Sequence, residues 1–317
     1  MIARNWIVVV LLALLAAVPP LAAWLDQPFY LDLLRRVMIF AIAAISLNLI
    51  LGYGGLVSFG HAAYLGIGAY AVGVLAFYGV HNGWLQWGVA IGASALVALA
   101  IGAVSVRTSG IYFIMITLAF TQMLYYLGIS IEEYGGDDGM RLPSRSQFSG
   151  LIDLNDATSF YFLVLALLAL SIWLVQRLVN SRFGRVIQAA RSNEARTRAI
   201  GISPYLYRLA AFVISGAMCG LAGALLVNQT AYLTPEFMNW TRSGELMFMV
   251  ILGGIGTASG PLLGAAALLL LEDLLQGWSV LPKAVTEHWQ LYLGVILILV
   301  VVFARRGLAG MIPGKHE

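Results

Sequence analysis

The sequence predicts an all-α fold, a polytopic membrane helix bundle with about ten transmembrane helices, from its composition, its apolar runs and its placement of charge. Of the 317 residues, 61% are hydrophobic and only 10% are charged. A soluble domain carries roughly 25% charged residues, so this chain has too few charges to cover a water-facing surface. We therefore expect a single transmembrane domain over residues 1–317.

Apolar runs give ten candidates for membrane-spanning helices, each of which needs about 20 residues to cross. In chain order they are 6–25, 33–51, 57–79, 84–106, 110–130, 159–177, 208–229, 244–256, 261–276 and 288–304. The eighth run is short and ends in a glycine-rich stretch, so a half-helix or a re-entrant segment stays open there. Residues 1–23 resemble a signal peptide, but we expect them to remain as the first span.

Charge in the loops predicts the orientation, because cytoplasmic loops are enriched in Lys and Arg. From Arg177 to Arg208, both included, there are seven arginines against the single acid Glu194, whereas residues 131–158 carry six acids and two arginines. We expect the loop 178–207 inside, the acidic loop outside, and both termini cytoplasmic. Basic residues near the termini favour the same arrangement: Arg4, Arg305, Arg306 and Lys315. Arg35 and Arg36 do not fit this predicted orientation, because they fall at the outer end of the second span.

Small residues recur at helical spacing in two spans. In lipid, helices associate through close packing of small side chains, so we expect these faces to be helix contacts. The residues are Ala62, Gly66 and Gly73 in the third span, and Gly216 and Gly220 in the seventh.

A glycine cluster at 52–55 (GYGG) separates the second and third spans. Open backbone at membrane depth survives only when it is buried in protein or faces a water-filled cavity. For the cluster, a tight turn stays open as the alternative to such open backbone. For the polar residues near it, hydrogen bonds between helices, or bonds from threonine to its own helix backbone, stay open beside the lining of a polar path for a solute. The candidate path residues are Asn48, Ser58 and His61 beside the cluster, and Thr117, Thr121 and Gln122 in the fifth span.

No acidic or basic residue sits at the centre of a span, whereas carriers driven by protons or sodium ions usually have an ionisable or ion-coordinating group there. This favours energy supplied from elsewhere. A phosphate-binding loop needs a glycine pattern with Lys followed by Ser or Thr, and the two lysines, Lys283 and Lys315, have neither. We expect no enzyme, no cofactor and no metal site in this chain, and no nucleic-acid partner.

The arginine-rich loop is predicted to form one amphipathic surface helix over 182–204, with Val186, Ala189, Ala190, Asn193, Thr197 and Ile200 on one side. Glu194 and Arg198 are spaced to pair on it, and Gly201 is expected to end it. Two interpretations stay open: the helix lies on anionic membrane lipid, or it docks into a partner protein.

Four segments resemble the permease subunits of branched-chain amino-acid ABC transporters, of the LivM type. They are SLNLILGYGGLVSFGHAAYLGIGAYA (46–71), RTSGIYFIMITLAF (107–120), FGRVIQAARSNEARTRAIGI (183–202) and FMVILGGIGTASGPLLGAAALLLLEDLL (248–275). The resemblance implies a bacterial inner-membrane importer with a second, LivH-type permease, two ATPase subunits that bind the ATP, and a substrate-binding protein. It also implies that a cytoplasmic coupling helix lies at 184–200, and its candidate residues are Arg185, Arg191, Asn193, Glu194, Ala195, Arg198 and Gly201. The family's Glu-Ala-Ala…Gly signature is matched imperfectly, because Arg196 replaces the second alanine and Gly201 comes one residue late.

The resemblance implies branched-chain amino acids as substrates, with urea, short amides or aromatic acids as alternatives. A self-sufficient secondary carrier or channel for a small polar solute, and a scaffold or enzyme subunit of a membrane complex, are the alternative functions.

Overall fold

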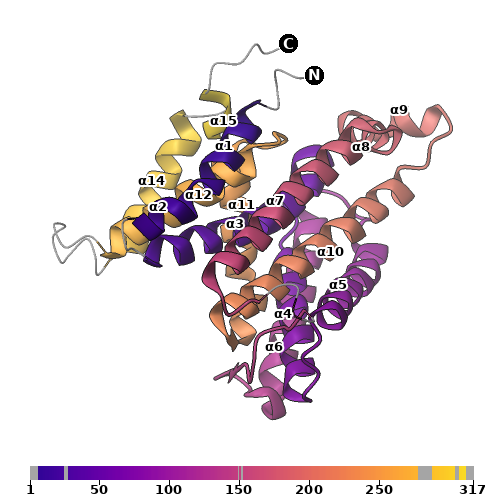
Figure 1. Ribbon diagram of the computed structural model, residues 1–317. Coiled ribbons are helices and arrows are strands. Elements are labelled where there is room, and N and C mark those ends of the chain that lie inside the picture. The colour runs from indigo at the N-terminus through magenta and orange to yellow at the C-terminus, as the bar shows by residue number, and fades with distance from the viewer. Residues whose placement is uncertain are drawn as a thin grey trace.

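The computed structural model describes residues 6–24, 28–148, 150, 153–277, 288–303 and 307–311, and these residues are mostly helical (Figure 1). The first half contains α1 (Trp6–Ala16), α2 (Val18–Trp24), α3 (Pro28–Asn48), the π-helix η2 (Leu49–Tyr53), α4 (His61–Phe77), α5 (Gly83–Ser105), α6 (Ile111–Ser130), the 3-10 turn η3 (Glu132–Tyr134) and β1 (Met140–Arg141). The second half contains α7 (Ala157–Asn180), α8 (Arg182–Ser192), α9 (Glu194–Ala199), α10 (Pro204–Thr230), β2 (Tyr232–Leu233), the 3-10 turn η4 (Pro235–Met238), α11 (Trp240–Gly253), α12 (Gly260–Gly277), α14 (Trp289–Phe303) and α15 (Gly307–Met311).

A helix overlaps each of the ten predicted spans, but the helices differ in length. Within the part of the chain that the structure describes, five helices are long and apolar enough to cross a membrane, namely α3 continued by η2, α5, α6, α7 and α10. The number of crossings therefore stays a prediction. At 1.5 Å per residue, the 14 residues of α11 extend only about 21 Å, less than the ~30 Å hydrocarbon core. The first span is divided between α1 and α2 where Pro19 and Pro20 remove backbone donors.

The centre of the bundle is built from α3, α4 and α10. Every residue from Val37 to Ile50 on α3 and η2 is buried, whereas α5 and α6 turn much of their apolar surface outward. A helix that is apolar all round is suited to this central place, and α5 and α6 beside it expose apolar side chains on their outer faces.

Close helix contacts use glycines, although not always the predicted ones. A Cβ on Gly220 would lie 2.1 Å from the Ser94 hydroxyl of α5, so α10 and α5 touch there, and Gly216 faces Ala98 in the same way. Where α4 meets α10, the contact falls on Gly68, whose Cβ would lie 1.9 Å from the Gly220 carbonyl oxygen.

The predicted small face of α4 packs differently from the expectation. Gly66 lies against Met238 of η4, and Gly73 lies against Leu233 of β2, so neither faces a long helix. Ala62 is buried, and its backbone N–H donates to the Ser243 hydroxyl of α11 at 2.9 Å. The face is therefore covered by the β2–η4–α11 segment that follows α10.

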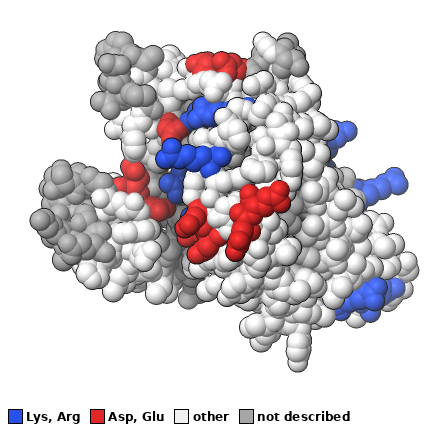
Figure 2. Space-filling view, turned by 90° about the horizontal axis from the view of Figure 1, so that it is seen from below, with Lys and Arg blue, Asp and Glu red and all other residues white. Residues whose placement is uncertain are grey.

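The two ends of the bundle carry different elements (Figure 1). The start of α1, together with α8, α9 and α15, lies at one end, and β1, β2 and η3 lie at the other. The second end exposes Glu132, Glu133, Asp137 and Asp138, and acidic side chains gather there with basic ones between them (Figure 2). Which end faces the cytoplasm stays a prediction, and four residues used for it lie outside the described part: Arg4, Arg305, Arg306 and Lys315.

Arg35, one of the two arginines that do not fit the predicted orientation, is buried in the protein. It pairs with Asp32, and its guanidinium carbon lies 4.6 Å from the centre of the Phe160 ring. A buried arginine is tolerated when it is paired, so this side chain joins α3 to α7.

Candidate functional site

The helix that begins as α3 is interrupted before α4. After the π-helix η2, residues 54–60 leave the helical ladder, and four of these seven residues are buried. Gly55 has φ +70°, a conformation that favours glycine. A π-helix is rare and is frequent at functional sites, so this interruption is the first part of the candidate site.

Hydroxyl groups from neighbouring helices satisfy the open backbone at Phe59. Its N–H donates to the Thr117 hydroxyl at 3.2 Å, and its carbonyl accepts from Thr121 at 3.0 Å and from Ser243 at 2.7 Å. The Ser58 hydroxyl accepts the Gly60 N–H at 3.1 Å. The structure thus brings three of the predicted path residues together, and it uses them to hold backbone.

Asn48 connects the interruption to another loop. Its side-chain oxygen accepts the Gly256 N–H and its side-chain nitrogen donates to the Thr257 carbonyl, both at 2.9 Å. These two backbone groups belong to the loop between α11 and α12. Asn48 therefore joins the end of α3 to that loop.

His61 is fully buried at the start of α4 and faces α10. Its Nε2 lies 2.7 Å from the Ser215 hydroxyl, which donates to the Ser46 carbonyl at 2.5 Å. Because that hydroxyl proton is committed to Ser46, the Nε2–H form of His61 suits the arrangement. Among the described residues, His61 Nδ1 has no hydrogen-bond partner.

Two other buried polar atoms also lack a hydrogen-bond partner within the described chain, namely the Tyr64 hydroxyl near the interruption and Gln122 Oε1 on α6. A Cβ built on Gly60 would lie 3.2 Å from Ser58 Oγ and 3.6 Å from the Tyr64 hydroxyl, so these groups converge there. Sequence reasoning missed Tyr64 and Ser243, since each looks like an ordinary residue of an apolar span and no spacing distinguishes it.

The arginine-rich loop forms two helices, where one was predicted. Asn193 adopts an extended conformation with φ −160°, ends α8, and accepts the Arg196 N–H at 2.9 Å as the N-cap of α9. An asparagine is among the preferred residues for such a cap. Thr197 and Ala190 are buried as expected from the predicted face, but Asn193 itself and the 69%-exposed Ile200 are not, nor is Ala189. The break at Asn193 turns the two helices and changes which residues face inward.

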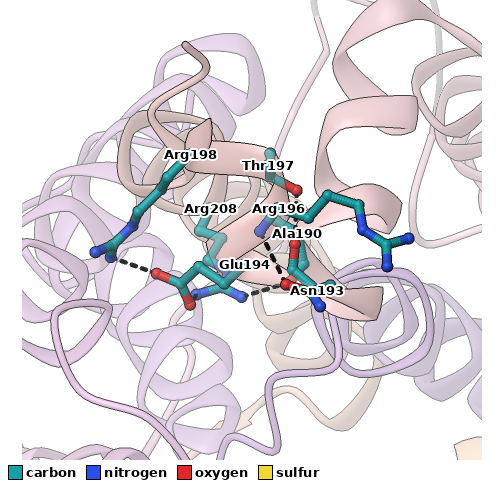
Figure 3. A network of polar contacts seen from close by, with 7 residues as sticks. All are labelled: Ala190, Asn193, Glu194, Arg196, Thr197, Arg198 and Arg208. Atoms are coloured by element: carbon teal, nitrogen blue, oxygen red, sulfur yellow. Dashed lines mark hydrogen bonds and ion pairs between the residues drawn. The ribbon is translucent and has the colours of Figure 1, made fainter. Parts of the chain in front are cut away.

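Glu194 is held by two arginines (Figure 3). Its carboxylate lies 2.5 Å from Arg198 of α9 and 2.7 Å from Arg208 of α10, and Arg208 also donates to the Ala190 carbonyl at 3.1 Å. Partial burial raises the pKa of Glu194, but hydrogen bonds and charge from Arg208 and Arg198 outweigh it, so the pKa lies below its ordinary value. The Glu194–Arg198 ion pair confirms the pairing predicted from their spacing of four residues. The ion pair with Arg208 was not predicted, because Arg208 lies beyond Gly201 on the next helix, α10.

Six of the seven predicted coupling residues are exposed, the exception being the half-buried Glu194. The exposed residues are Arg185, Arg191, Asn193, Ala195, Arg198 and Gly201, and Gly201 follows α9 with φ +84°. Arg191 is exposed as well, but its guanidinium also donates to the Gly52 carbonyl of η2. The loop therefore has an outer surface open to a partner and an inner contact with the helix interruption.

Comparison with known proteins places the chain among transport proteins. A family model described as the branched-chain amino acid transport system / permease component matches residues 29–301. The high-affinity branched-chain amino acid permease LivM of Salmonella typhimurium is 29% identical, over 88% of this chain and 70% of that protein. LivH of Escherichia coli is 25% identical over 86% and 91%, and the autoinducer 2 import permease LsrC of Salmonella paratyphi B is 31% identical over 57% and 52%. No solved structure matches the chain.

Proposed function

Because the chain belongs to the branched-chain amino acid transport permease family, we propose that it is the membrane-spanning permease subunit of an ABC importer. The importer would move branched-chain amino acids, or a similar small net-neutral solute, across the bacterial inner membrane. Two partner ATPases would bind and hydrolyse the ATP, a LivH-type permease would complete the membrane core, and a binding protein would deliver the solute at the acidic end of the bundle. This chain would be a transport subunit and no enzyme.

The observation that carries this proposal is the form of the arginine-rich loop. It presents exposed residues on its outer side, while Glu194–Arg208 and Arg191–Gly52 fix its inner side to α10 and η2. A loop built in this way suits the transfer of movement from a docked protein to the helices. Membrane lipid would still contact the flanking spans, but ion pairs directed into the protein favour protein docking over a helix that only lies on lipid.

The solute path would run beside the interruption at 54–60. Atoms already engaged there, in Thr117, Thr121 and Asn48, would keep the open backbone in shape. Three polar groups without a partner in the described structure would be free to meet a passing solute, namely His61 Nδ1, the Tyr64 hydroxyl and Gln122 Oε1. Buried polar atoms without a partner are costly, so a bound solute or water would relieve that cost.

Reconstitution in proteoliposomes tests the function. The permease pair, both ATPases and the binding protein should accumulate radiolabelled leucine when ATP is inside with the ATPases, and the permeases alone should not. Uptake by this chain without any ATPase would instead establish a secondary carrier or channel. Competition by isoleucine, valine, urea, acetamide and phenylalanine would sort the substrate, because the likeness to an autoinducer 2 permease shows that relatives named for another solute also match.

A further inference from the structure

The Gly52 carbonyl lies where the regular backbone hydrogen bonds of the helix end. In a continuing α-helix it would accept the N–H of residue 56, but the Leu56 N–H donates instead to the Ile50 carbonyl at 2.9 Å. The Gly55 N–H donates to the Leu51 carbonyl at 3.2 Å. Among the described residues, the group that donates to Gly52 is the Arg191 guanidinium, which comes from α8, 139 residues further along the chain.

The same turn is packed on both sides. A Cβ on Gly52 would lie 2.1 Å from Asn48 Oδ1 and 2.6 Å from the Gly256 nitrogen, so the loop between α11 and α12 rests directly on it. A Cβ on Gly55 would lie 2.8 Å from Arg191 Cγ, so the stem of Arg191 crosses the turn before its head reaches Gly52. Movement of α8 in the membrane plane would therefore push or release η2.

We infer that Arg191 is a positioning residue that joins the arginine-rich loop to the helix interruption, and that its task is inside the permease, not on the surface of an ATPase. It holds the Gly52 carbonyl, and through Asn48 the same turn holds Gly256 and Thr257. Shifts of α8 thus reach residues 54–60 and the α11–α12 loop together. This inference rests on the proposed function for its meaning in transport, but the contact itself can be tested without it.

The first test is hydrogen exchange on the purified full-length permease. Arg191→Met should speed backbone exchange in peptides covering 52–60 by about tenfold, the change that corresponds to losing one hydrogen bond to a charged group. Arg191→Lys, which keeps a donor, should give a smaller change. The matched control is Arg182→Met, on the exposed face of the same helix. Equal exchange in Arg191→Met and Arg182→Met would overturn the contact.

The second test is the number of solute molecules moved per ATP in the reconstituted importer. Arg191→Met should lower this ratio several-fold while the ATPases still bind and hydrolyse ATP, because movement of α8 is no longer transmitted to residues 54–60. A ratio equal to that of the unaltered protein, or a loss of ATPase binding, would overturn the inference. If the unaltered importer shows no ATP-driven uptake, the proposed function fails, and the exchange experiment still decides whether Arg191 holds the turn.

Discussion

Phe59 places a backbone carbonyl at the break before α4, where side chains must take over from the helix ladder. Ser243 contributes most, because its hydroxyl donates to Phe59 and also accepts the Ala62 N–H. Thr121 lies within reach of Phe59 and of the Thr117 carbonyl of its own helix, at 2.9 Å. Serine and threonine hydroxyls in these apolar spans thus bond backbone groups, and this role explains them before a solute path is needed.

Ser243→Ala should therefore destabilise the permease more than Thr121→Val. The first change leaves the Ala62 N–H unpaired in a buried position and costs about 1–3 kcal/mol, whereas after the second Ser243 still donates to Phe59. Thermal unfolding in detergent measures the difference. Ser130→Ala is the control, since its exposed hydroxyl bonds only its own helix at Tyr126. Equal melting temperatures for all three variants would contradict the role of these hydroxyls.

Glu194 makes stability depend on pH. Its pKa is lowered in the folded protein, so the ionised pair stabilises the fold fully above the unfolded pKa, near 4.5, and this contribution disappears as the pH falls through the lower folded pKa. Glu194→Gln should cost about 1 kcal/mol at neutral pH and nothing once the carboxyl is protonated. Unfolding followed from pH 7 to pH 3 checks this, with exposed Glu132→Gln as control. A pH profile shared by both variants would show that the ionised Glu194, with its two arginine partners, adds no stability.

Among the elements, α4, α5 and α10 pack so closely that backbone touches backbone. Gly223 of α10 is the tightest case, because a Cβ there would lie 1.8 Å from the Leu65 carbonyl oxygen of α4. Gly66 is crowded only by the Met238 side chain, which can move. Helices of small residues approach in this way in lipid, but spacing alone does not tell which glycine meets backbone.

Three alanine substitutions separate these cases. Gly223→Ala should destabilise by about 1–3 kcal/mol, as overpacking does, and Gly66→Ala by less. Gly92→Ala on α5 meets nothing within 4 Å, and should be neutral or stabilise by up to about 1 kcal/mol, since alanine is the better helix former. Melting temperatures of the three proteins give the order. A tolerated Gly223→Ala would mean that α4 and α10 are less tightly packed than described.

Periodicity and length located the helices because an apolar run in a membrane has few other structures available. Ends and breaks were harder. Pro19-Pro20 carries a visible signal for the division of the first span, whereas the π-turn at η2 depends on Asn48, Gly256 and Arg191, which are far apart in the chain. The break at Asn193 was also hard to predict from the sequence. An asparagine inside an amphipathic pattern can be recognised as a cap only once the direction of the following helix is known.

At the scale of the whole molecule, the candidate site consists of contacts between segments that are far apart in the sequence. Glu194 and Arg198 were identifiable from their spacing, but Arg208, Ser243 and Tyr64 join the site through the fold. The arginine-rich loop and the acidic loop lie at opposite ends of the bundle (Figure 1). If the protein works as proposed, one end must meet ATPases and the other a binding protein, so the direction of insertion decides whether both partners can act.

Cysteine labelling tests that direction. The native Cys219 is buried, so a membrane-impermeant maleimide should leave the unaltered protein unlabelled. Glu133→Cys should react in intact spheroplasts, because its loop is expected outside, and Arg196→Cys should react only after permeabilisation, because arginine-rich loops stay in the cytoplasm. Both positions are exposed, so access to the thiol is set by the membrane alone. The reverse pattern would invert the orientation and place the proposed ATPase surface outside the cell, where no ATPase could drive it.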